Sequence, residues 1–206
     1  MATLLHLDSS GKGSMSVTRP LTQYFQEQWQ AANKNGKVIS RDLLSSNLQF
    51  VNPELVQAFY TPEDKQTAIQ VQTLKQSDEL IDELFEADTY VIGAPMYNFS
   101  VPAVLKAYLD LVIRAGKTFS YDNGAPLGLL KNKRLIVITS SGGDYSVEPM
   151  KNFDFLEPYL RSVFGFLGVR DVHVFTAPGR DPQSIATASA AVKKQIDDVV
   201  SLNVVA

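Results

Sequence analysis

The sequence predicts an α/β fold: a doubly wound, five-stranded parallel sheet in the order 2-1-3-4-5 with helices on both faces. Three observations support this prediction. Short strand-like runs alternate with segments of helical periodicity, which is typical of a parallel sheet with helical crossovers. The alternation repeats five times. No linker, internal repeat or low-complexity tract interrupts it, so we expect residues 1–206 to form one domain.

Five strand-like runs are the expected strands, and the first helix follows the first of them. The strands are residues 3–8, 37–41, 89–94, 134–140 and 170–176. The first helix opens near Thr18, with Pro20 in its first turn, where proline is tolerated. Its apolar face is expected to hold Leu21, Tyr24, Phe25, Trp29 and Ala32.

Three later helices have recognisable starts. Thr61-Pro62-Glu63-Asp64 has the pattern of a capping box and predicts the start of the second helix. The third is expected to start at Ser100, with Pro102 in its first turn, and the last after Asp181-Pro182. The inward residues predicted for the second helix are Leu74, Ile81, Leu84 and Phe85; those for the third are Val101, Val104, Leu105, Tyr108, Leu111 and Val112; those for the last are Ile185, Ala188, Val192, Ile196 and Val199.

Three segments exceed the needs of a minimal fold of this kind. Residues 45–60 and 117–131 are apolar excursions, and Asp122-Asn123-Gly124 in the second predicts a hairpin turn. The expected helix 153–167 carries too many apolar residues for one stripe. Either one thick core absorbs them or a second copy of the chain covers them. We favour a homodimer.

The composition excludes several classes of protein. The 19 basic and 22 acidic side chains give a formal net charge of −3, so we expect no nucleic-acid partner. The 45% hydrophobic content argues against disorder. Without cysteine there are no disulfides, thiolate metal sites or cysteine nucleophiles. The sequence has neither a signal-peptide pattern nor an apolar run of about 20 residues, so we expect a cytoplasmic protein without a membrane partner.

The loop after the first expected strand predicts an anion site. Its sequence, Ser9-Ser10-Gly11-Lys12-Gly13-Ser14-Met15-Ser16-Val17-Thr18, places hydroxyls and glycines before a helix. Helix N-termini of this kind bind phosphate monoesters. A polar turn with a capping hydroxyl is the alternative. Walker spacing is absent, and serine stands where a dinucleotide fingerprint has its third glycine.

Two further loops follow the third and fourth expected strands, at the edge where open parallel sheets bind ligands. Ala94-Pro95-Met96-Tyr97-Asn98-Phe99-Ser100-Val101-Pro102 combines aromatic rings, an amide and prolines. Such a stiff, flat surface suits a planar heterocycle, although aromatic packing in a tight turn would account for Phe99. Ser140-Ser141-Gly142-Gly143-Asp144-Tyr145-Ser146 allows close backbone approach to a ligand, with a flexible loop as the alternative.

Recognisable catalytic side chains are missing. His6 and His173 lie inside expected strands and are interpreted as core or edge residues, and no nucleophile elbow or zinc-binding helix appears. We assign no catalytic residue and no metal ligand. A cofactor that carries out its own chemistry would need few catalytic groups from the chain.

The sequence resembles the FMN-dependent NADH azoreductases, flavodoxin-like enzymes also described as NADH:quinone oxidoreductases. The matching motifs cover the whole chain in order. They are Asp8-Ser9-Ser10, Ser16-Val17-Thr18, Arg41-Asp42-Leu43, Ala94-Pro95-Met96-Tyr97-Asn98-Phe99, Arg114-Ala115-Gly116-Lys117-Thr118-Phe119, Ser140-Ser141-Gly142-Gly143, Pro158-Tyr159-Leu160, Phe166-Leu167-Gly168 and Asp171-Val172.

The resemblance implies a flavodoxin-like FMN-binding domain that works as a homodimer. It places the FMN phosphate on Ser10, Ser16, Val17 and Thr18. The isoalloxazine ring would lie on Met96, Tyr97, Asn98 and Phe99, and Ser140, Ser141, Gly142 and Gly143 would close around its pyrimidine side. Several members carry arginine where Ser141 stands here, which leaves the choice between NADH and NADPH open.

The mechanism implied by the resemblance is ping-pong. A reduced nicotinamide, NADH or NADPH, passes hydride to FMN and leaves, and a quinone or azo compound then accepts two electrons in the same space. Tyr121 and Tyr145 are candidate walls of that space. Two alternatives remain. One is a flavodoxin-type electron carrier, although such carriers tend to be strongly acidic and the net charge here is only −3. The other is a nucleotide-binding protein without flavin.

Overall fold

The computed structural model describes residues 1–201 and contains a five-stranded sheet in the order β2-β1-β3-β6-β7. Every neighbouring pair in this sheet is parallel. The order confirms the 2-1-3-4-5 arrangement expected for the parallel strands, and each expected strand begins within one residue of the observed one. The strands are β1 (Thr3–Asp8), β2 (Lys37–Asp42), β3 (Thr89–Pro95), β6 (Arg134–Ser141) and β7 (Asp171–Pro178).

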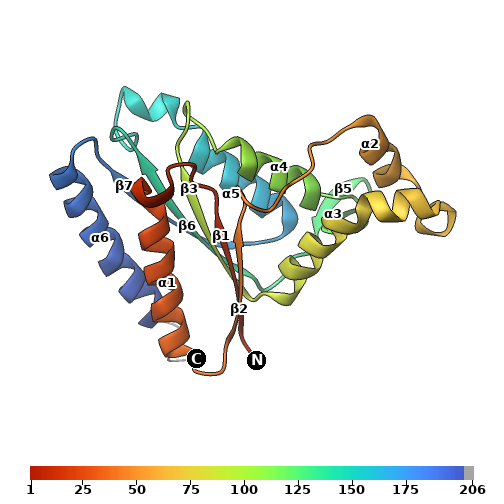
Figure 1. The fold of residues 1–206 in the computed structure, drawn as a ribbon, viewed down its shortest axis with the longest axis horizontal. Helices are drawn as coiled ribbons and strands as arrows, with labels where there is room; N and C mark the ends of the chain where they lie inside the picture. The colour runs from red at the N-terminus through yellow and green to blue at the C-terminus, as the bar shows by residue number, and fades with distance from the viewer. Residues whose placement is uncertain (202–206) are drawn as a thin grey trace.

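Helices cover both faces of this sheet (Figure 1). One layer consists of α1 (Thr18–Ala32) and α6 (Pro182–Ser201). The opposite layer holds α3 (Ala68–Glu86), α4 (Ala103–Val112) and α5 (Leu156–Leu167), and α2 (Pro53–Tyr60) packs against α3. Within residues 1–201, no helix is long and apolar enough to cross a membrane.

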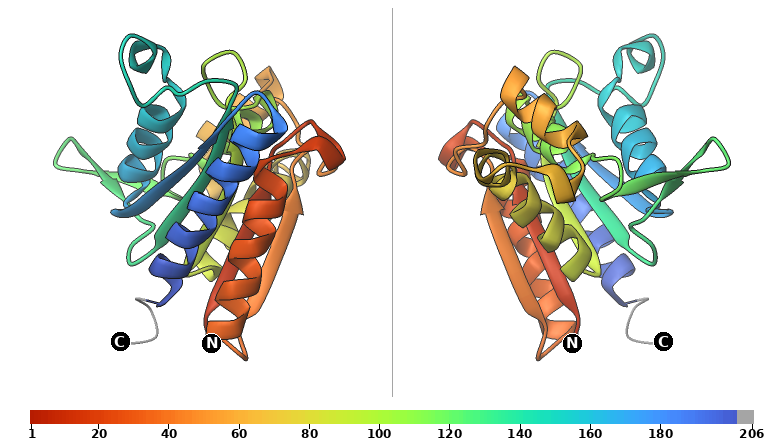
Figure 2. Two further views of the ribbon diagram at one scale, coloured as in Figure 1. Left: turned by 90° about the vertical axis from the view of Figure 1, so that its left-hand side faces the viewer. Right: turned by 90° about the vertical axis from the view of Figure 1, so that its right-hand side faces the viewer.

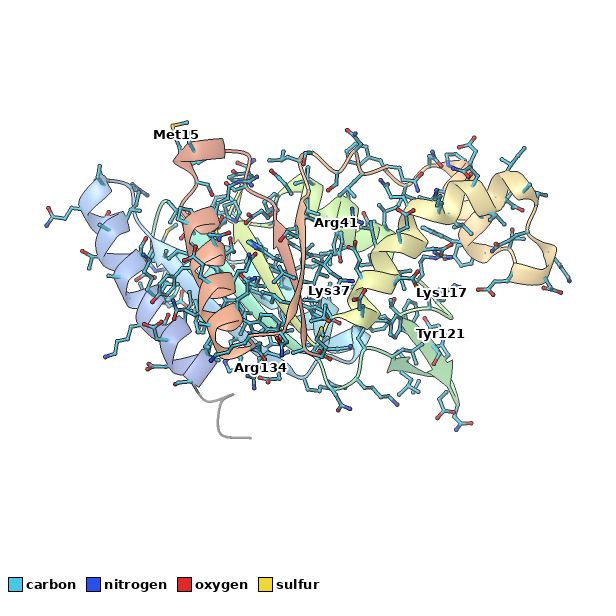
Figure 3. The ribbon with its side chains drawn as sticks, turned by 60° about the horizontal axis from the view of Figure 1, so that its bottom comes forward. Met15, Lys37, Arg41, Lys117, Tyr121 and Arg134 are labelled. Carbon is cyan, nitrogen blue, oxygen red and sulfur yellow. The ribbon has the colours of Figure 1, made fainter. Side chains whose placement is uncertain are left out.

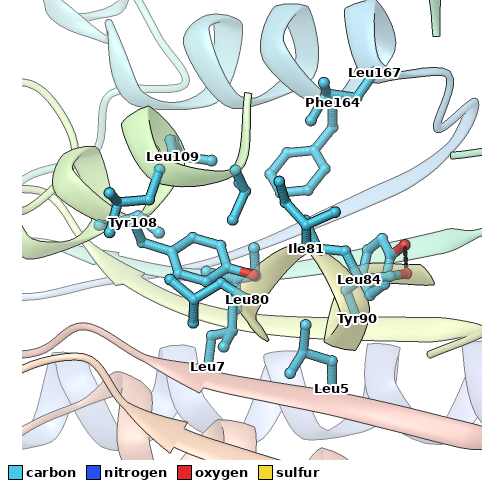
Figure 4. Close-up of a cluster of buried hydrophobic side chains, with 14 of the residues drawn as sticks. Leu5, Leu7, Leu80, Ile81, Leu84, Tyr90, Tyr108, Leu109, Phe164 and Leu167 are labelled. Carbon is cyan, nitrogen blue, oxygen red and sulfur yellow. Dashed lines mark hydrogen bonds between the residues drawn. The ribbon is translucent and has the colours of Figure 1, made fainter. Parts of the chain in front are cut away.

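Each helical layer encloses its own apolar core. Leu4 of β1 packs toward α1 and α6, whereas Leu5 packs toward α3, α4 and α5, because successive side chains of a strand point to opposite faces. Figure 4 shows the larger core, in which Tyr90 and Phe164 are fully buried and the Tyr90 hydroxyl donates to the Leu84 carbonyl at 2.6 Å. Burial of this extent holds the sheet rigid beneath the loops at its carboxyl edge.

Three details of the predicted helices are wrong. The second helix, α3, begins at Ala68 with Thr67 as its N-cap, not at Thr61. The third, α4, begins at Ala103, and Pro102 is its N-cap instead of lying in its first turn, because Tyr97 and Ser100 close a tight turn first. Two residues predicted to face inward are exposed: Phe85, at 41%, and Ala32, the last residue of α1.

The predicted hairpin is confirmed. It consists of β4 (Phe119–Asp122) and β5 (Ala125–Gly128), joined by Asn123 and Gly124 with φ of 49° and 81°. Positive φ at both central residues is the geometry of a type I′ turn. The chain after the hairpin is anchored to α5, because the Leu130 N–H donates to the Leu167 carbonyl at 2.9 Å.

The apolar helix expected at 153–167 divides into a 3₁₀ turn, Met150–Phe153, and α5. Leu156, Leu160 and Phe164 of α5 are buried in the larger core. Phe155 and Phe166, at its two ends, remain 57% and 37% exposed. The surplus apolar surface predicted for this segment is therefore present on a single chain.

Candidate functional site

Four loops meet at the carboxyl edge of the sheet and enclose a pocket of about 320 Å³. They follow β1, β3, β6 and β7, and the volume falls at the lower end of the range for ligand pockets, roughly 300–1,000 Å³. A larger hollow of about 670 Å³ lies at the opposite edge, beside the first residues of β3, β6 and β7. The lining of the smaller pocket is Ser10, Lys12, Met15, Val17, Pro95, Met96, Tyr97, Ser140, Ser141, Gly142, Ala177, Gly179, Arg180 and Ile185.

The loop of residues 9–17 brings hydroxyl groups to the N-terminus of α1. Ser9 and Ser10 are buried, and the Ser9 hydroxyl donates to the Gly93 carbonyl at 2.6 Å, which fastens the loop to β3. The Ser16 hydroxyl accepts from the Arg19 N–H at 3.2 Å and lies 3.3 Å from the Thr18 hydroxyl. The first N–H groups of a helix lack intrahelical acceptors and carry partial positive charge. This end of the pocket is built to accept an anion.

A cluster of charged side chains lies behind that loop. One terminal nitrogen of Arg19 contacts both carboxylate oxygens of Asp42 at 2.8 Å and donates to the Ser10 carbonyl at 3.0 Å. The other terminal nitrogen lies 3.6 Å from Asp8. The hydrogen bond with Asp42 raises the pKa of Arg19, and the same bond lowers the pKa of Asp42. Both groups are therefore charged in any ordinary buffer.

His6 belongs to the same cluster and is buried in β1, as expected. Its Nδ1 lies 2.7 Å from the side-chain oxygen of Gln26, and its Nε2 lies 3.4 Å from Asp8. Burial alone would lower the pKa of His6, but the neighbouring Asp8 carboxylate and the hydrogen bond with Gln26 together outweigh burial, and the pKa is raised. His6 does not line the pocket, so its role is in the network behind the loop.

The loop after β3 is folded into an unusual tight turn. Tyr97 and Ser100 exchange backbone hydrogen bonds of 3.0 and 3.2 Å. Asn98 and Phe99 between them have φ of 48° and 73°, a region that few non-glycine residues occupy and that is enriched at ligand sites. The Tyr97 hydroxyl accepts from the Gly11 N–H at 3.1 Å. Its side chain thus bridges the first and second loops across the pocket.

Phe99 turns away from the pocket. Its ring lies 5.5 Å from that of Phe153 and 6.2 Å from that of Tyr145, and its carbonyl accepts from the Phe155 N–H at 3.0 Å. Aromatic packing in a tight turn therefore accounts for the Phe99 side chain within one chain.

The loops after β6 and β7 close the other side of the pocket. The Ser141 hydroxyl donates to the Gly143 carbonyl at 2.6 Å and fixes the turn. Arg180, in the loop after β7, donates through Nε to the Gly142 carbonyl. Lys12 lies in the loop after β1 and is exposed. These two cations line the pocket, and among the described residues no aspartate or glutamate does, so the pocket is electropositive within a chain of net charge −3.

The structure brings together most of the site residues expected from the sequence. Ser10, Val17, Met96, Tyr97, Ser140, Ser141 and Gly142 line one pocket. Ser16 and Thr18 are buried beneath it, whereas Asn98, Phe99 and Gly143 do not line it. Of the candidate walls, Tyr145 packs against Phe99, and Tyr121 lies on the hairpin against Phe119, away from Met15 at the pocket rim (Figure 3).

Sequence reasoning missed the loop after β7. Arg180 and Gly179 line the pocket together with Ala177 and Ile185. The available signal was the predicted strand order: β7 pairs with β6 in parallel register up to Ser141 and Pro178, so the loops after these two strands must emerge side by side. The three loops predicted to lie at this edge follow β1, β3 and β6.

Several proteins are similar in sequence to this chain over most of its length. A family model described as "Flavodoxin-like fold" matches residues 2–200. The FMN-dependent NADH:quinone oxidoreductase of Acidobacterium capsulatum is 47% identical over 180 residues, 87% of each chain. FMN-dependent NADH:quinone oxidoreductase 1 of Hahella chejuensis is 46% identical over 185 residues, 88% of each chain.

Solved structures agree with these sequence relatives. An azoreductase from Bacillus anthracis superimposes with a TM-score of 0.89 at 25% identity, covering 97% of this chain and 99% of that one. An FMN-dependent NADH-azoreductase of the same species, in complex with FMN, gives 0.87 at 25% identity, covering 97% of this chain and all of that one. This chain therefore belongs to the flavodoxin-like fold family and, within it, to the family of FMN-dependent NADH:quinone oxidoreductases.

Proposed function

We propose that this protein is an FMN-dependent oxidoreductase that takes hydride from NADH, reduces quinones by two electrons and cleaves aromatic azo compounds. The names of its relatives support each part of this activity. The observation that carries the proposal is the electropositive pocket at the carboxyl edge of the sheet. It joins a hydroxyl-rich helix N-terminus to a stiff loop of aromatic and amide residues, in a chain 47% identical to such an enzyme.

The residues of the pocket fit FMN. The Gly11 N–H in the first loop already donates to an oxygen acceptor, the Tyr97 hydroxyl. The N-terminus of α1 beside it favours a phosphate. Ser10, Ser16, Val17 and Thr18 would hold that phosphate. Opposite them, Met96, Tyr97, Asn98 and Phe99 would line the ring, and Ser140, Ser141, Gly142 and Gly143 would close around its pyrimidine edge.

The chain contributes binding and orientation. Bound FMN would supply the two-electron chemistry, and a flat nicotinamide or quinone would react by stacking beside it. The pocket lining holds no histidine or carboxylate among the described residues, so we assign no general acid or base. Lys12 and Arg180 would attract the phosphates of the nicotinamide nucleotide as well as that of FMN.

A spectroscopic experiment tests this function. We expect the purified protein to retain flavin absorbance after FMN addition and desalting, and to lose it stoichiometrically when NADH is added without oxygen. Addition of a quinone should restore the absorbance and support continuous NADH consumption. Flavin retained without bleaching by NADH or NADPH would instead favour an electron carrier. A protein that retains no flavin would contradict the proposal altogether.

Three finer properties remain proposals. The exposed aromatic residues on α5 and around it favour a homodimer, which the exposed Phe155 and Phe166 could help to form. The nicotinamide preference is open, since Ser141 is neutral and Arg180 supplies the cation beside Gly142. A cytoplasmic location stays a prediction of the sequence, and a chain without cysteine is compatible with a reducing compartment.

A further inference from the structure

Arg19 connects three parts of the site that lie apart in the sequence. Its side chain comes from the first turn of α1 and reaches the Ser10 carbonyl of the first loop and the carboxylate of Asp42 at the end of β2. Its own N–H donates to the Ser16 hydroxyl. Arg19 does not line the pocket. Arg19 contacts the loop of residues 9–17 on the side that faces away from the pocket. The opposite side of this loop forms the anion site.

The contact with Ser10 fixes the orientation of one peptide group. In a planar trans peptide the carbonyl and the N–H point in opposite directions. The Ser10 carbonyl is held on Arg19 at 3.0 Å, so the N–H of Gly11 must point the other way. There it meets the Tyr97 hydroxyl, a pocket-lining oxygen, at 3.1 Å. The reversed peptide would present a carbonyl oxygen to an anion and repel it.

The charge of Arg19 is largely cancelled where it stands. Asp42 contacts the guanidinium at 2.8 Å and Asp8 lies 3.6 Å away. A cation paired with two carboxylates contributes little net potential to a pocket in front of it. The electropositive lining is instead Lys12 and Arg180. Orientation, not charge, is what Arg19 can offer the ligand.

We propose that Arg19 is a positioning residue of the phosphate site: by holding the Ser10 carbonyl back, it keeps the Gly11 N–H on the side of the Tyr97 hydroxyl, where that N–H would donate to the phosphate of bound FMN in place of the hydroxyl, and so makes the protein select FMN over riboflavin. This inference rests on the proposed flavin function. Asp42 is the anchor of the arrangement, because it holds the same terminal nitrogen that donates to Ser10.

Two substitutions separate orientation from charge. Arg19→Lys keeps the positive charge but replaces the planar guanidinium by a single ammonium group. Asp42→Asn removes one negative charge and replaces one of the two oxygens that hold Arg19 by an amide NH2 group, which cannot accept from the guanidinium. Arg41→Lys is the matched control: Arg41 precedes Asp42, is 27% exposed against 24% for Arg19, and pairs through two nitrogens with Glu83, away from the first loop (Figure 3).

Dissociation constants for FMN and for riboflavin are to be measured by flavin fluorescence on each flavin-free full-length protein. We expect Arg19→Lys and Asp42→Asn each to weaken FMN binding about tenfold, which corresponds to about 1.4 kcal/mol, with riboflavin binding changed less than about twofold. Arg41→Lys should leave both constants unchanged. Circular dichroism checks that each variant is folded.

The outcomes distinguish the two ideas. If Arg19 acted through its charge, Arg19→Lys would bind FMN as the wild type does and Asp42→Asn would bind it more tightly; either result overturns the inference. Equal weakening of both flavins, or the same loss in Arg41→Lys, would show general loosening and also overturn it. A wild-type protein that binds no FMN would instead overturn the proposed function.

Discussion

Gly93 of β3 lies close to the start of α1 beneath the anion site. A Cβ there would lie 2.8 Å from an Asp8 carboxylate oxygen and 3.0 Å from the Thr22 methyl group. Asp8 cannot move aside freely, because the Thr22 hydroxyl donates to it at 2.9 Å and Arg19 stands beside it. The absence of a side chain at Gly93 therefore lets the start of α1 pack onto β3.

We expect Gly93→Ala to destabilise the protein by about 1–3 kcal/mol, the usual cost of overpacking a filled core. Urea unfolding followed by circular dichroism measures the change. Gly165→Ala is the control: Gly165 lies in α5 with nothing within 4 Å of an added Cβ, and alanine is favoured over glycine in a helix by about 1 kcal/mol. Equal stability of Gly93→Ala and wild type would contradict this account of the close approach.

At the scale of single residues, the sequence identified which residue types and which loops belong to the site, but not the directions in which the side chains point. Ser10 and Tyr97 were expected at the site because hydroxyls before a helix and aromatics after a strand are typical of ligand loops. The Phe99 side chain, by contrast, packs outside the pocket, since a left-handed backbone at two successive residues redirects it. Arg180 was missed because its contact with Gly142 depends on the pairing of β6 with β7.

The start of α3 shows how an element can be misread by a few residues. Thr67 accepts from the Gln70 N–H at 3.3 Å, and the Gln70 side chain accepts from the Thr67 N–H at 3.0 Å, which makes a complete capping box. We expect Thr67→Ala to cost about 1 kcal/mol, the usual contribution of an N-cap hydroxyl, measured as a shift in the urea midpoint.

The control for this prediction lies in the same helix. Thr73 is six residues further on, and its hydroxyl donates to the Ile69 carbonyl of the preceding turn at 2.9 Å. Thr73→Ala removes a β-branched residue from a helix interior, so its stability should equal or slightly exceed that of the wild type. A loss of about 1 kcal/mol in both variants, or in neither, would argue against a specific cap at Thr67.

Thr61 matched the same pattern, yet it ends a helix. Its hydroxyl donates to the Gln57 carbonyl of α2 at 2.7 Å. Glu63 after it forms an ion pair with Lys117, 54 residues away in the sequence. Local spacing cannot distinguish two candidate caps six residues apart when such distant contacts decide between them. The strands, in contrast, were predicted nearly to the residue. The central strands β1, β3 and β6 are buried on both faces and leave continuous apolar runs in the sequence.

At the scale of the whole molecule, six of the exposed apolar side chains lie on or around α5, while others, such as Phe50 and Tyr60, lie on or beside α2. We define the α5 surface as Phe99, Tyr121, Leu127, Phe153, Phe155 and Phe166, all between 37% and 67% exposed. They belong to the loop after β3, the hairpin, the 3₁₀ turn before α5 and α5 itself. Figure 2 shows that the hairpin, this turn and α5 project from the same side of the sheet.

Phe99 lies against Phe153 at one end of this surface, and Tyr121 and Phe166 both lie against Phe119 at the other. We expect the surface to be buried between two copies of the chain, because large exposed apolar patches mark interaction sites and two-fold dimers are the commonest assembly. Light scattering should give twice the 22.7 kDa of one chain.

Phe155→Glu should shift the mass toward that of the monomer, since a carboxylate without a partner is costly to bury. Phe85→Glu is the control, because Phe85 is 41% exposed at the end of α3, outside the α5 surface, and should leave the mass unchanged. A wild-type mass of one chain, or a Phe155→Glu protein that stays dimeric, would mean that this surface does not form the contact.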